Sequence, residues 1–282
     1  GEDVGSYAVT PQAVREQGNY AVSVKAGTLT INPRPVTLTS ADAEKEYDGS
    51  PLTSSEVTVS ADGFASGEGA SYEVSGEQTL VGFAENSFTY TLDENTLAFD
   101  YRIRQVYGLL KVLNRNARYE IEVQAKSATF LYDGEEKQVN ELVSTRFGIN
   151  DQIYTVEGLQ ADTHAVHAGK YEVHVVGNPT VYDASGNDVS EQFVVTARSG
   201  LLEIQPREVV LQSANATKIY DGKPLFNHEV EIGRDGFVRS DGVSIQMSGI
   251  RTTPGTAENS FDYRLNEGTL ADDYQIQTVY GL

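Results

Sequence analysis

The chain repeats itself at a fixed distance, and this feature constrains its fold more than any other. Residues 34–109 align with residues 207–282 at a constant offset of 173 without a gap, and about 41 of the 76 aligned positions are identical. Tyr47-Asp48-Gly49 returns as Tyr220-Asp221-Gly222, and Val106-Tyr107-Gly108-Leu109 returns as Val279-Tyr280-Gly281-Leu282. Such a repeat predicts a fold built from copies of one unit rather than one large core.

A second, more distant type of module lies between the two copies. It has its own Tyr132-Asp133-Gly134 and ends at Pro206, and the first 33 residues resemble its last part. The order predicts an N-terminal segment that is the end of an A-type module (1–33), a first B module (34–114), an A module (115–206) and a second B module that lacks its last strand (207–282). Because the chain begins and ends inside modules, we expect a fragment of a longer array.

Each module is predicted to consist of β-strands. Apolar and polar residues alternate with period two in Tyr20–Val24, Val36–Ser40, Tyr101–Val106 and Phe193–Ala197. Asp-Gly pairs such as Asp48-Gly49 separate these runs and supply residues suited to tight turns. No 12-residue window has a helical period. The pattern predicts an all-β chain of small β-sandwich modules, either Ig-like or β-grasp-like.

The joints between modules are short and contain proline. A final strand runs directly into the next first strand at 31–36 and again at 204–209, through Pro33 and Pro206. Proline fixes its own φ and keeps the preceding residue extended, so these joints are predicted to be stiff. Strands of about seven residues span roughly 23 Å, and modules placed end to end would form a rod of order 120 Å.

The composition excludes several classes of protein. The chain has 41 acidic and 21 basic residues, a net charge of −20, which argues against nucleic acid as a partner. It has no cysteine, so disulfides, thiolate metal sites and thiol nucleophiles are absent. No apolar run approaches the roughly 18 residues of a membrane span, and we expect no membrane insertion within this segment. No nucleophile elbow, phosphate loop or His-Glu-x-x-His motif is present, so the chain is not expected to be an enzyme.

Four sets of residues are candidates for other chemistry. The three Tyr-Asp-Gly motifs are interpreted as turns anchored by tyrosine, with a ligand-facing tyrosine as the alternative. An intramolecular isopeptide bond would use Lys45 or Lys218 with Asn86 or Asn259. No cofactor is expected. Calcium is the candidate ion, with Asp183, Asn187 and Asp188 as its ligands and Asp272-Asp273 as a weaker group. The four histidines are His164, His167, His174 and His228. The first two are expected on opposite faces of one strand, His174 is interpreted as solvated, and no metal site is expected among the four.

The combined motifs resemble a known family of repeats. They are Tyr47-Asp48-Gly49-Ser50-Pro51-Leu52, Asn86-Ser87-Phe88-Thr89-Tyr90, Asp100-Tyr101-Arg102-Ile103 and Tyr107-Gly108-Leu109-Leu110-Lys111-Val112. This pattern is similar to the MBG or "YDG" repeat domains of large bacterial surface proteins. The resemblance implies an extracellular protein attached to the cell wall through regions outside this fragment. The resemblance implies no catalytic residues.

Three functions agree with these observations. The first is a non-catalytic stalk or spacer of an adhesin-like protein, in which each module contacts only its neighbours along the chain. In the second, the modules themselves bind host glycans, mucin or matrix protein through some of the 16 tyrosines. The third, and weakest, is an accessory region of a secreted carbohydrate-active enzyme. Exposed tyrosines would favour adhesion; here Tyr7, Tyr20, Tyr90 and Tyr101 are expected to be buried, and Tyr72 and Tyr154 less constrained.

Overall fold

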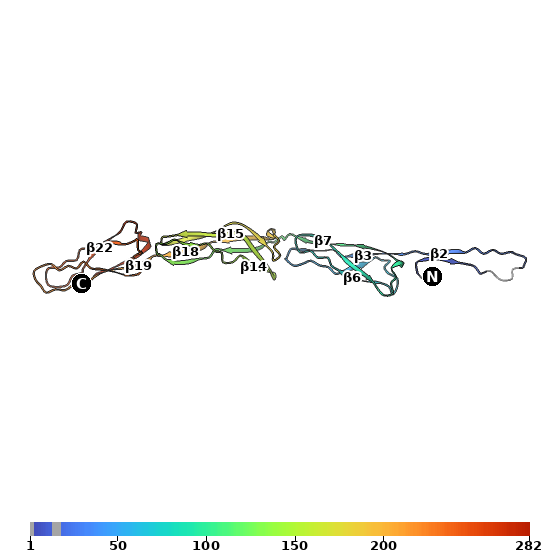
Figure 1. Cartoon of the computed structure of the whole chain (residues 1–282), viewed down its shortest axis with the longest axis horizontal. Helices are drawn as coiled ribbons and strands as arrows, with labels where there is room; N and C mark the ends of the chain where they lie inside the picture. Colours follow the sequence, from blue (N-terminus) through green and yellow to red (C-terminus); the bar gives the residue numbers. More distant parts are fainter. Residues whose placement is uncertain (1–2, 13–17) are drawn as a thin grey trace. The chain divides into compact units, whose positions relative to one another are not determined.

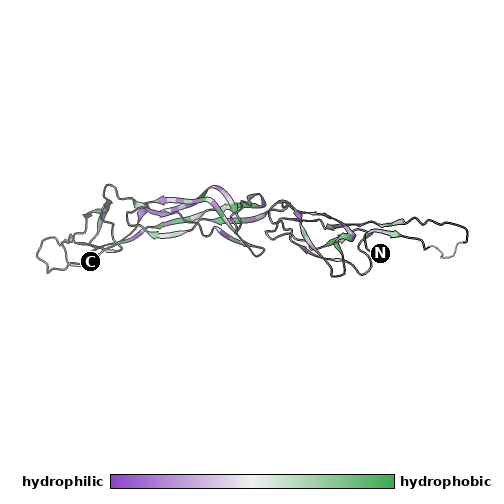
Figure 2. Ribbon diagram, turned by 45° about the vertical axis from the view of Figure 1, so that its right-hand side comes forward, coloured by the Kyte–Doolittle hydropathy of each residue, from purple (hydrophilic) through white to green (hydrophobic). Residues whose placement is uncertain are grey.

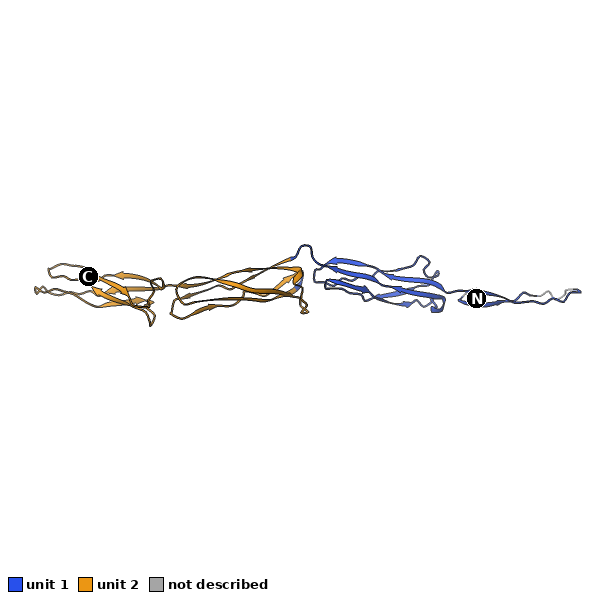
Figure 3. Ribbon diagram, turned by 90° about the horizontal axis from the view of Figure 1, so that it is seen from above, with its two compact units in different colours: residues 1–118, 150–152 blue, residues 119–149, 153–282 orange. Residues whose placement is uncertain are grey.

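A computed structural model describes residues 3–12 and 18–282. They divide into two compact units, residues 1–118 with 150–152 and residues 119–149 with 153–282 (Figure 3). The described residues form β-strands and three short 3-10 helices, η1 (Ala98–Asp100), η2 (Ser190–Gln192) and η3 (Ala271–Asp273), so the all-β prediction is confirmed. Each sheet found in these residues lies inside one predicted module. No described helix has the length and apolar character needed to cross a membrane.

The N-terminal segment forms one antiparallel pair, β1 (Gly5–Val9) with β2 (Gly27–Ile31). The strand predicted at Tyr20–Val24 is wrong, because these residues have no strand pairing and Tyr20 is 82% exposed. Its counterpart in the A module is a strand only because a parallel partner lies beside it. Alternation of apolar and polar residues shows only that a segment is able to form a strand. The described residues contain no partner strand for Tyr20–Val24.

The first B module has eight strands in three sheets. They are β3 (Arg34–Ser40), β4 (Ala43–Glu46), β5 (Val57–Val59), β6 (Ala70–Val74), β7 (Gly82–Asn86), β8 (Phe88–Leu92), β9 (Tyr101–Val106) and β10 (Gly108–Leu113), some labelled in Figure 1. The sheet orders are β5-β3-β9, β4-β10-β7 and β6-β8. Val36 and Leu38 of β3 pack with Phe88 and Tyr101 in the core. Alternate residues of β3 thus form the core, as the period of two predicts.

The A module also has eight strands. They are β11 (Tyr119–Gln124), β12 (Ala128–Leu131), β13 (Lys137–Val139), β14 (Arg146–Ile149), β15 (Gln152–Ala165), β16 (Gly169–Tyr182), β17 (Phe193–Arg198) and β18 (Gly200–Gln205). β11 pairs with β17, and the larger sheet has the order β12-β18-β16-β15-β13, with β14 beside β15. The long β15–β16 hairpin has a register shift between Glu157 and Leu159, where Gly158 has a φ of 81°.

The second B module contains β19 (Arg207–Ser213), β20 (Val230–Arg234), β21 (Val243–Met247), β22 (Phe261–Leu265) and β23 (Tyr274–Val279). Their sheets are β20-β19-β23 and β21-β22. Hydrophobic and hydrophilic residues alternate along many strands of both units (Figure 2). Segments 216–219 and 255–259, which correspond to β4 and β7, have no strand pairing.

Two parallel strands of the first B module change sheets together: β3 pairs with β9, and after the crossing β4 pairs with β10. At the crossing the buried Ser40 hydroxyl accepts the Gly108 N–H at 2.9 Å and donates to the Asn86 carbonyl at 2.5 Å. The second copy repeats this at Ser213, with 3.0 and 2.6 Å. The asparagine shared by the copies is therefore part of the strand crossing.

Candidate functional site: the junction between modules

The A module and the second B module meet at a joint of one residue. β18 ends at Gln205 and β19 begins at Arg207, which confirms the short joint at Pro206. Buried apolar residues from both modules form one hydrophobic cluster across this joint, including Tyr132, Leu202 and Ile204 on one side and Val209, Leu211 and Tyr274 on the other. Separating the modules would expose this shared core to water, which opposes bending at the joint.

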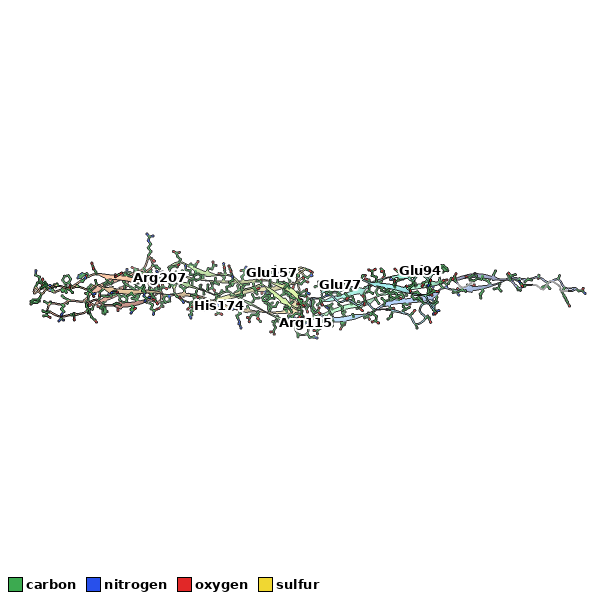
Figure 4. The ribbon with its side chains drawn as sticks, turned by 90° about the horizontal axis from the view of Figure 1, so that it is seen from below. Glu77, Glu94, Arg115, Glu157, His174 and Arg207 are labelled. Carbon is green, nitrogen blue, oxygen red and sulfur yellow. The ribbon has the colours of Figure 1, made fainter. Side chains whose placement is uncertain are left out.

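An arginine at the start of the second B module contacts the Tyr-Asp-Gly turn of the A module. The Arg207 guanidinium (Figure 4) donates from Nη1 to the Tyr132 carbonyl at 3.2 Å, from Nε to the Gly236 carbonyl at 3.0 Å, and from Nη2 to the Asp235 carbonyl. In the first unit, Arg115 Nη1 likewise donates to the Tyr47 carbonyl at 3.1 Å. The planar guanidinium of Arg207 thus binds backbone carbonyls of both modules at the same time.

Two tyrosines from different modules share one carboxylate. The Tyr274 hydroxyl donates to Asp241 Oδ2 at 2.7 Å, and the Tyr132 hydroxyl donates to the same oxygen at 3.1 Å. The two rings pack edge to face with centroids 5.6 Å apart. Burial first, and then the hydrogen bond to Asp241, raise the pKa of both phenols well above their ordinary value.

A buried carboxylate of the second B module binds the A module. Asp273 is 1% exposed, and its Oδ1 accepts the Ala168 backbone N–H at 2.6 Å. Its Oδ2 lies 2.8 Å from Nδ1 of His167. The first unit has the same contact, since Asp100 Oδ1 accepts the Val4 N–H at 2.6 Å. This repetition makes the contact a property of the A-to-B junction.

No protein-family model matches this chain, and no curated protein matches it. The candidate site therefore rests on geometry. The polar groups of the junction form hydrogen bonds with one another. Carboxylates accept from tyrosine, histidine and backbone N–H groups, and arginine donates to backbone carbonyls. Within residues 3–12 and 18–282, no cluster of three or more histidine, aspartate or glutamate side chains is arranged to hold a metal. The arrangement serves to hold two modules in one orientation.

We expect the junction tyrosines to make the chain sensitive to alkaline pH. Their folded-state pKa lies above the unfolded value of about 10, so their contribution is complete below pH 10 and is lost as the pH rises above it. Urea denaturation followed by circular dichroism at pH 8 to 11 measures this loss. Tyr274→Phe, which cannot ionise, should show a shallower decline. An equal decline in the variant would contradict the assignment.

All three Tyr-Asp-Gly motifs form turns, as interpreted from the sequence, but a tyrosine anchor is wrong for the third motif, because Tyr220 is 65% exposed. Tyr47 is 1% exposed, Gly49 has a φ of 82°, and Asp48 Oδ1 accepts the Ser50 N–H at 2.9 Å. Asp133 accepts the Glu135 N–H at 2.9 Å and Lys137 Nζ at 2.6 Å; the lysine first, and then the backbone bond, lower the pKa of Asp133. These tyrosines anchor turns in the first B and A modules.

The lysines and asparagines considered for an isopeptide bond have other partners. Lys45 Nζ donates to Asp48 Oδ1 and to the Ser50 carbonyl, both at 2.7 Å. Asn86 Nδ2 donates to the Ala41 and Ser54 carbonyls, both at 3.0 Å. The second copy has the same arrangement, with Lys218 on Asp221 and Asn259 on backbone carbonyls. In both B modules the lysine thus stabilises the Tyr-Asp-Gly turn, and the asparagine amide stabilises the strand crossing.

The calcium candidates lie in one turn after β16. Asp183 Oδ1 accepts the Ser185 and Asn187 N–H groups at 2.9 and 2.8 Å, and its Oδ2 accepts Asn187 Nδ2 at 2.8 Å. Asp188 Oδ1 accepts the Ser190 hydroxyl at 2.6 Å. The carboxylates thus hold the turn itself, and calcium binding by Asp183, Asn187 and Asp188 stays a prediction. Of the weaker pair, Asp273 lies in the junction and Asp272 is exposed.

His174 is exposed, which confirms its interpretation as a solvated residue, and His164 and His228 are exposed as well. His164 lies in β15 but His167 follows the end of that strand, so the two do not lie on one strand as expected. His167 also has a half-exposed side chain, but its ring contacts the buried Asp273 and stacks on Tyr132 with centroids 6.2 Å apart. This pairing could not be predicted from the sequence, because 106 residues separate the histidine from the aspartate.

Two expectations about tyrosines were wrong. Tyr20, expected to be buried, is 82% exposed because its predicted strand has no partner. Tyr154, expected to be less constrained, is fully buried and its ring packs 4.8 Å from that of Phe193. Tyr101 is 8% exposed, as expected, while Tyr7 and Tyr90 are only partly buried.

Proposed function

We propose that the chain is a structural, non-catalytic stalk segment of a large bacterial cell-surface protein of the adhesin type. The observation that carries this proposal is the A-to-B junction. A spacer works only if each joint resists bending, and this joint combines a one-residue connection with a shared core and a buried carboxylate. The same Asp contact recurs at Asp100 and Asp273, as an extended array requires.

Bending at the joint would separate polar groups from their hydrogen-bond partners. Tilting the second B module away would leave the buried Asp273 carboxylate and the Ala168 N–H without partners. An unsatisfied buried polar group costs about 1–3 kcal/mol, and more if it is charged. The Arg207 hydrogen bonds and the apolar contacts of Tyr132 would be lost in the same movement. Each junction therefore favours one orientation.

The location is proposed from the resemblance to surface repeats and from composition. A net charge of −20 favours solubility outside the cell, and a chain without cysteine needs no oxidative folding. The proposed binding partners of each module are the neighbouring modules of the same chain. The module boundaries at 33/34, 114/115 and 206/207, and an Ig-like or β-grasp-like sandwich in each module, belong to the same proposal.

A second candidate function is adhesion by the modules themselves. Tyr107 and Tyr280 occupy equivalent positions and are 41% and 38% exposed, so both B modules present a partly exposed tyrosine at the same place. Such rings suit sugar faces or protein partners. A panel of glycans and mucins separates the two functions, because a spacer gives no saturable binding.

The stalk proposal predicts an extended particle in solution. Modules placed end to end over about 120 Å should give a radius of gyration of roughly 35 Å, against roughly 19 Å for a compact chain of this length. Small-angle X-ray scattering on the full chain at two salt concentrations measures this value. A radius near that of a compact chain would overturn the spacer function.

A further inference from the structure

The first B module and the A module each begin and end on neighbouring parallel strands. The chain enters the first B module at Arg34 on β3 and leaves it after Leu113 on β10, and it enters the A module on β11 and leaves on β18. β3 and β4 pair in parallel with β9 and β10, and β11 and β12 pair in parallel with β17 and β18. In each module, the points of entry and exit therefore lie at opposite ends of one parallel connection.

This parallel connection has the same length in both modules. The first pair of strands contains six aligned residue pairs and the second pair contains four, in the B module as in the A module. One more backbone bond follows at the far end, from the Tyr47 N–H to the Leu113 carbonyl and from the Tyr132 N–H to the Gln205 carbonyl, both at 2.9 Å. Two modules of different sequence thus join their first and last strands in the same way.

Side chains continue the connection where the strands change sheets. In the first B module the Leu109 N–H donates to Asp42 Oδ1 at 2.7 Å, and in the A module the Leu201 N–H donates to Ser127 Oγ at 2.9 Å. The residue before each of these donors is a glycine, and a Cβ added to it would overlap the facing backbone. The first and last strands therefore stay in close contact across the change of sheets.

Tension along the chain would slide these strands past each other. When a parallel pair is pulled from the start of one strand and the end of the other, the force acts along the strands and loads all of their hydrogen bonds together. A pair pulled from two adjacent ends opens one bond at a time. Buried side chains such as Leu38 of β3 and Leu110 of β10 would also have to leave the core as the strands slide. Unfolding under tension should therefore be slow.

We propose that the first B module and the A module bear tensile load. Their parallel first and last strands resist unfolding when the chain is pulled from both sides. The inference goes beyond the stalk function, because a spacer has to resist bending, whereas a load-bearing module has to resist stretching. It rests on the stalk function only for the source of the tension. A compact chain in the scattering experiment would overturn the stalk function and leave the unfolding force unchanged.

The test is single-molecule force spectroscopy on the full chain in two pulling directions. The natural chain has no cysteine, so two introduced cysteines define where the force is applied. Asn32→Cys with Arg118→Cys pulls the first B module from the start of β3 and from beyond the end of β10. Asn32→Cys with Arg102→Cys pulls it from two adjacent ends, because Arg102 pairs with Pro35 at the start of β3. All three substituted residues are exposed.

The two directions should give different forces in one and the same fold. At one loading rate, the force that unfolds the module should be about twofold higher or more for the Asn32 and Arg118 attachment than for the Asn32 and Arg102 attachment. The first attachment should lengthen by about 240 Å, because about 80 residues extend to roughly 3.5 Å each from a folded span of about 40 Å. Equal thermal melting of the two variants shows that only the direction of the force differs.

The A module repeats the comparison with different residues. Arg118→Cys with Gln205→Cys loads its first and last strands from opposite ends. Arg118→Cys with Val194→Cys pulls adjacent ends, because Val194 pairs with Glu120 in β11. The same order of forces is expected. The proposal fails if either module unfolds at equal force in the two directions, or at a higher force when adjacent ends are pulled.

Discussion

Gly108→Ala is expected to destabilise the first B module by about 3 kcal/mol, because an added Cβ would overlap the backbone of the facing strand. A Cβ on Gly108 would lie 2.5 Å from the carbonyl carbon and oxygen of Ala41 and from the carbonyl oxygen of Ser40. No side-chain rotation relieves a clash with main-chain atoms. The strands would have to separate where Ser40 holds the Gly108 N–H.

The measurement is differential scanning calorimetry on the full chain, where the transition of this module should fall by roughly 15 °C. Hydrogen exchange at β10 assigns the transition. Gly27→Ala is the matched control, because Gly27 begins the corresponding strand of the N-terminal segment and its added Cβ would meet nothing within 4 Å. Equal melting of the two variants would show that the strands do not approach this closely at the crossing.

The same glycine shows how far the sequence predicts the fold. Alternation in Val36–Ser40 and Tyr101–Val106 predicted strands β3 and β9, and the Asp-Gly pairs predicted turns. Alternation cannot show that two parallel strands leave one sheet together and enter another. The identity of Gly108 and Gly281 in the repeat indicated a constraint, but its cause became visible only when β4 and β10 lay side by side.

The junction was beyond prediction for a different reason. Asp273 has an acidic neighbour, and in the sequence the pair suggested a weak ion site. Its actual partners, Ala168 and His167, are more than 100 residues away, and nothing local distinguishes a buried carboxylate from an exposed one. One signal was available: Asp100 and Asp273 are identical in the repeat, while Phe99 and Asp272 beside them differ. An acidic residue that is identical in both copies, beside a position that differs, indicates that its carboxylate has a specific binding partner.

Asp273→Ala is expected to uncouple the A module from the second B module. The described side-chain contacts of this carboxylate are with the A module, so its removal leaves the Ala168 N–H and the His167 ring without their partner. Loss of a hydrogen bond to a buried charged group costs about 2.7 kcal/mol, which corresponds to roughly 100-fold faster exchange of the Ala168 amide. Hydrogen exchange read by NMR at that amide measures the effect.

Two comparisons separate the junction from a general loss of stability. Asp272→Ala removes the exposed neighbour and should leave exchange at Ala168 unchanged. Asp100→Ala should accelerate exchange at Val4, the counterpart in the first unit, and leave Ala168 unaffected. If Asp273→Ala accelerated exchange equally at Ala168 and throughout β19, the carboxylate would stabilise its own module rather than the joint. A change confined to the joint identifies the residue that fixes the orientation of one module on the next, which is the property that a stalk requires.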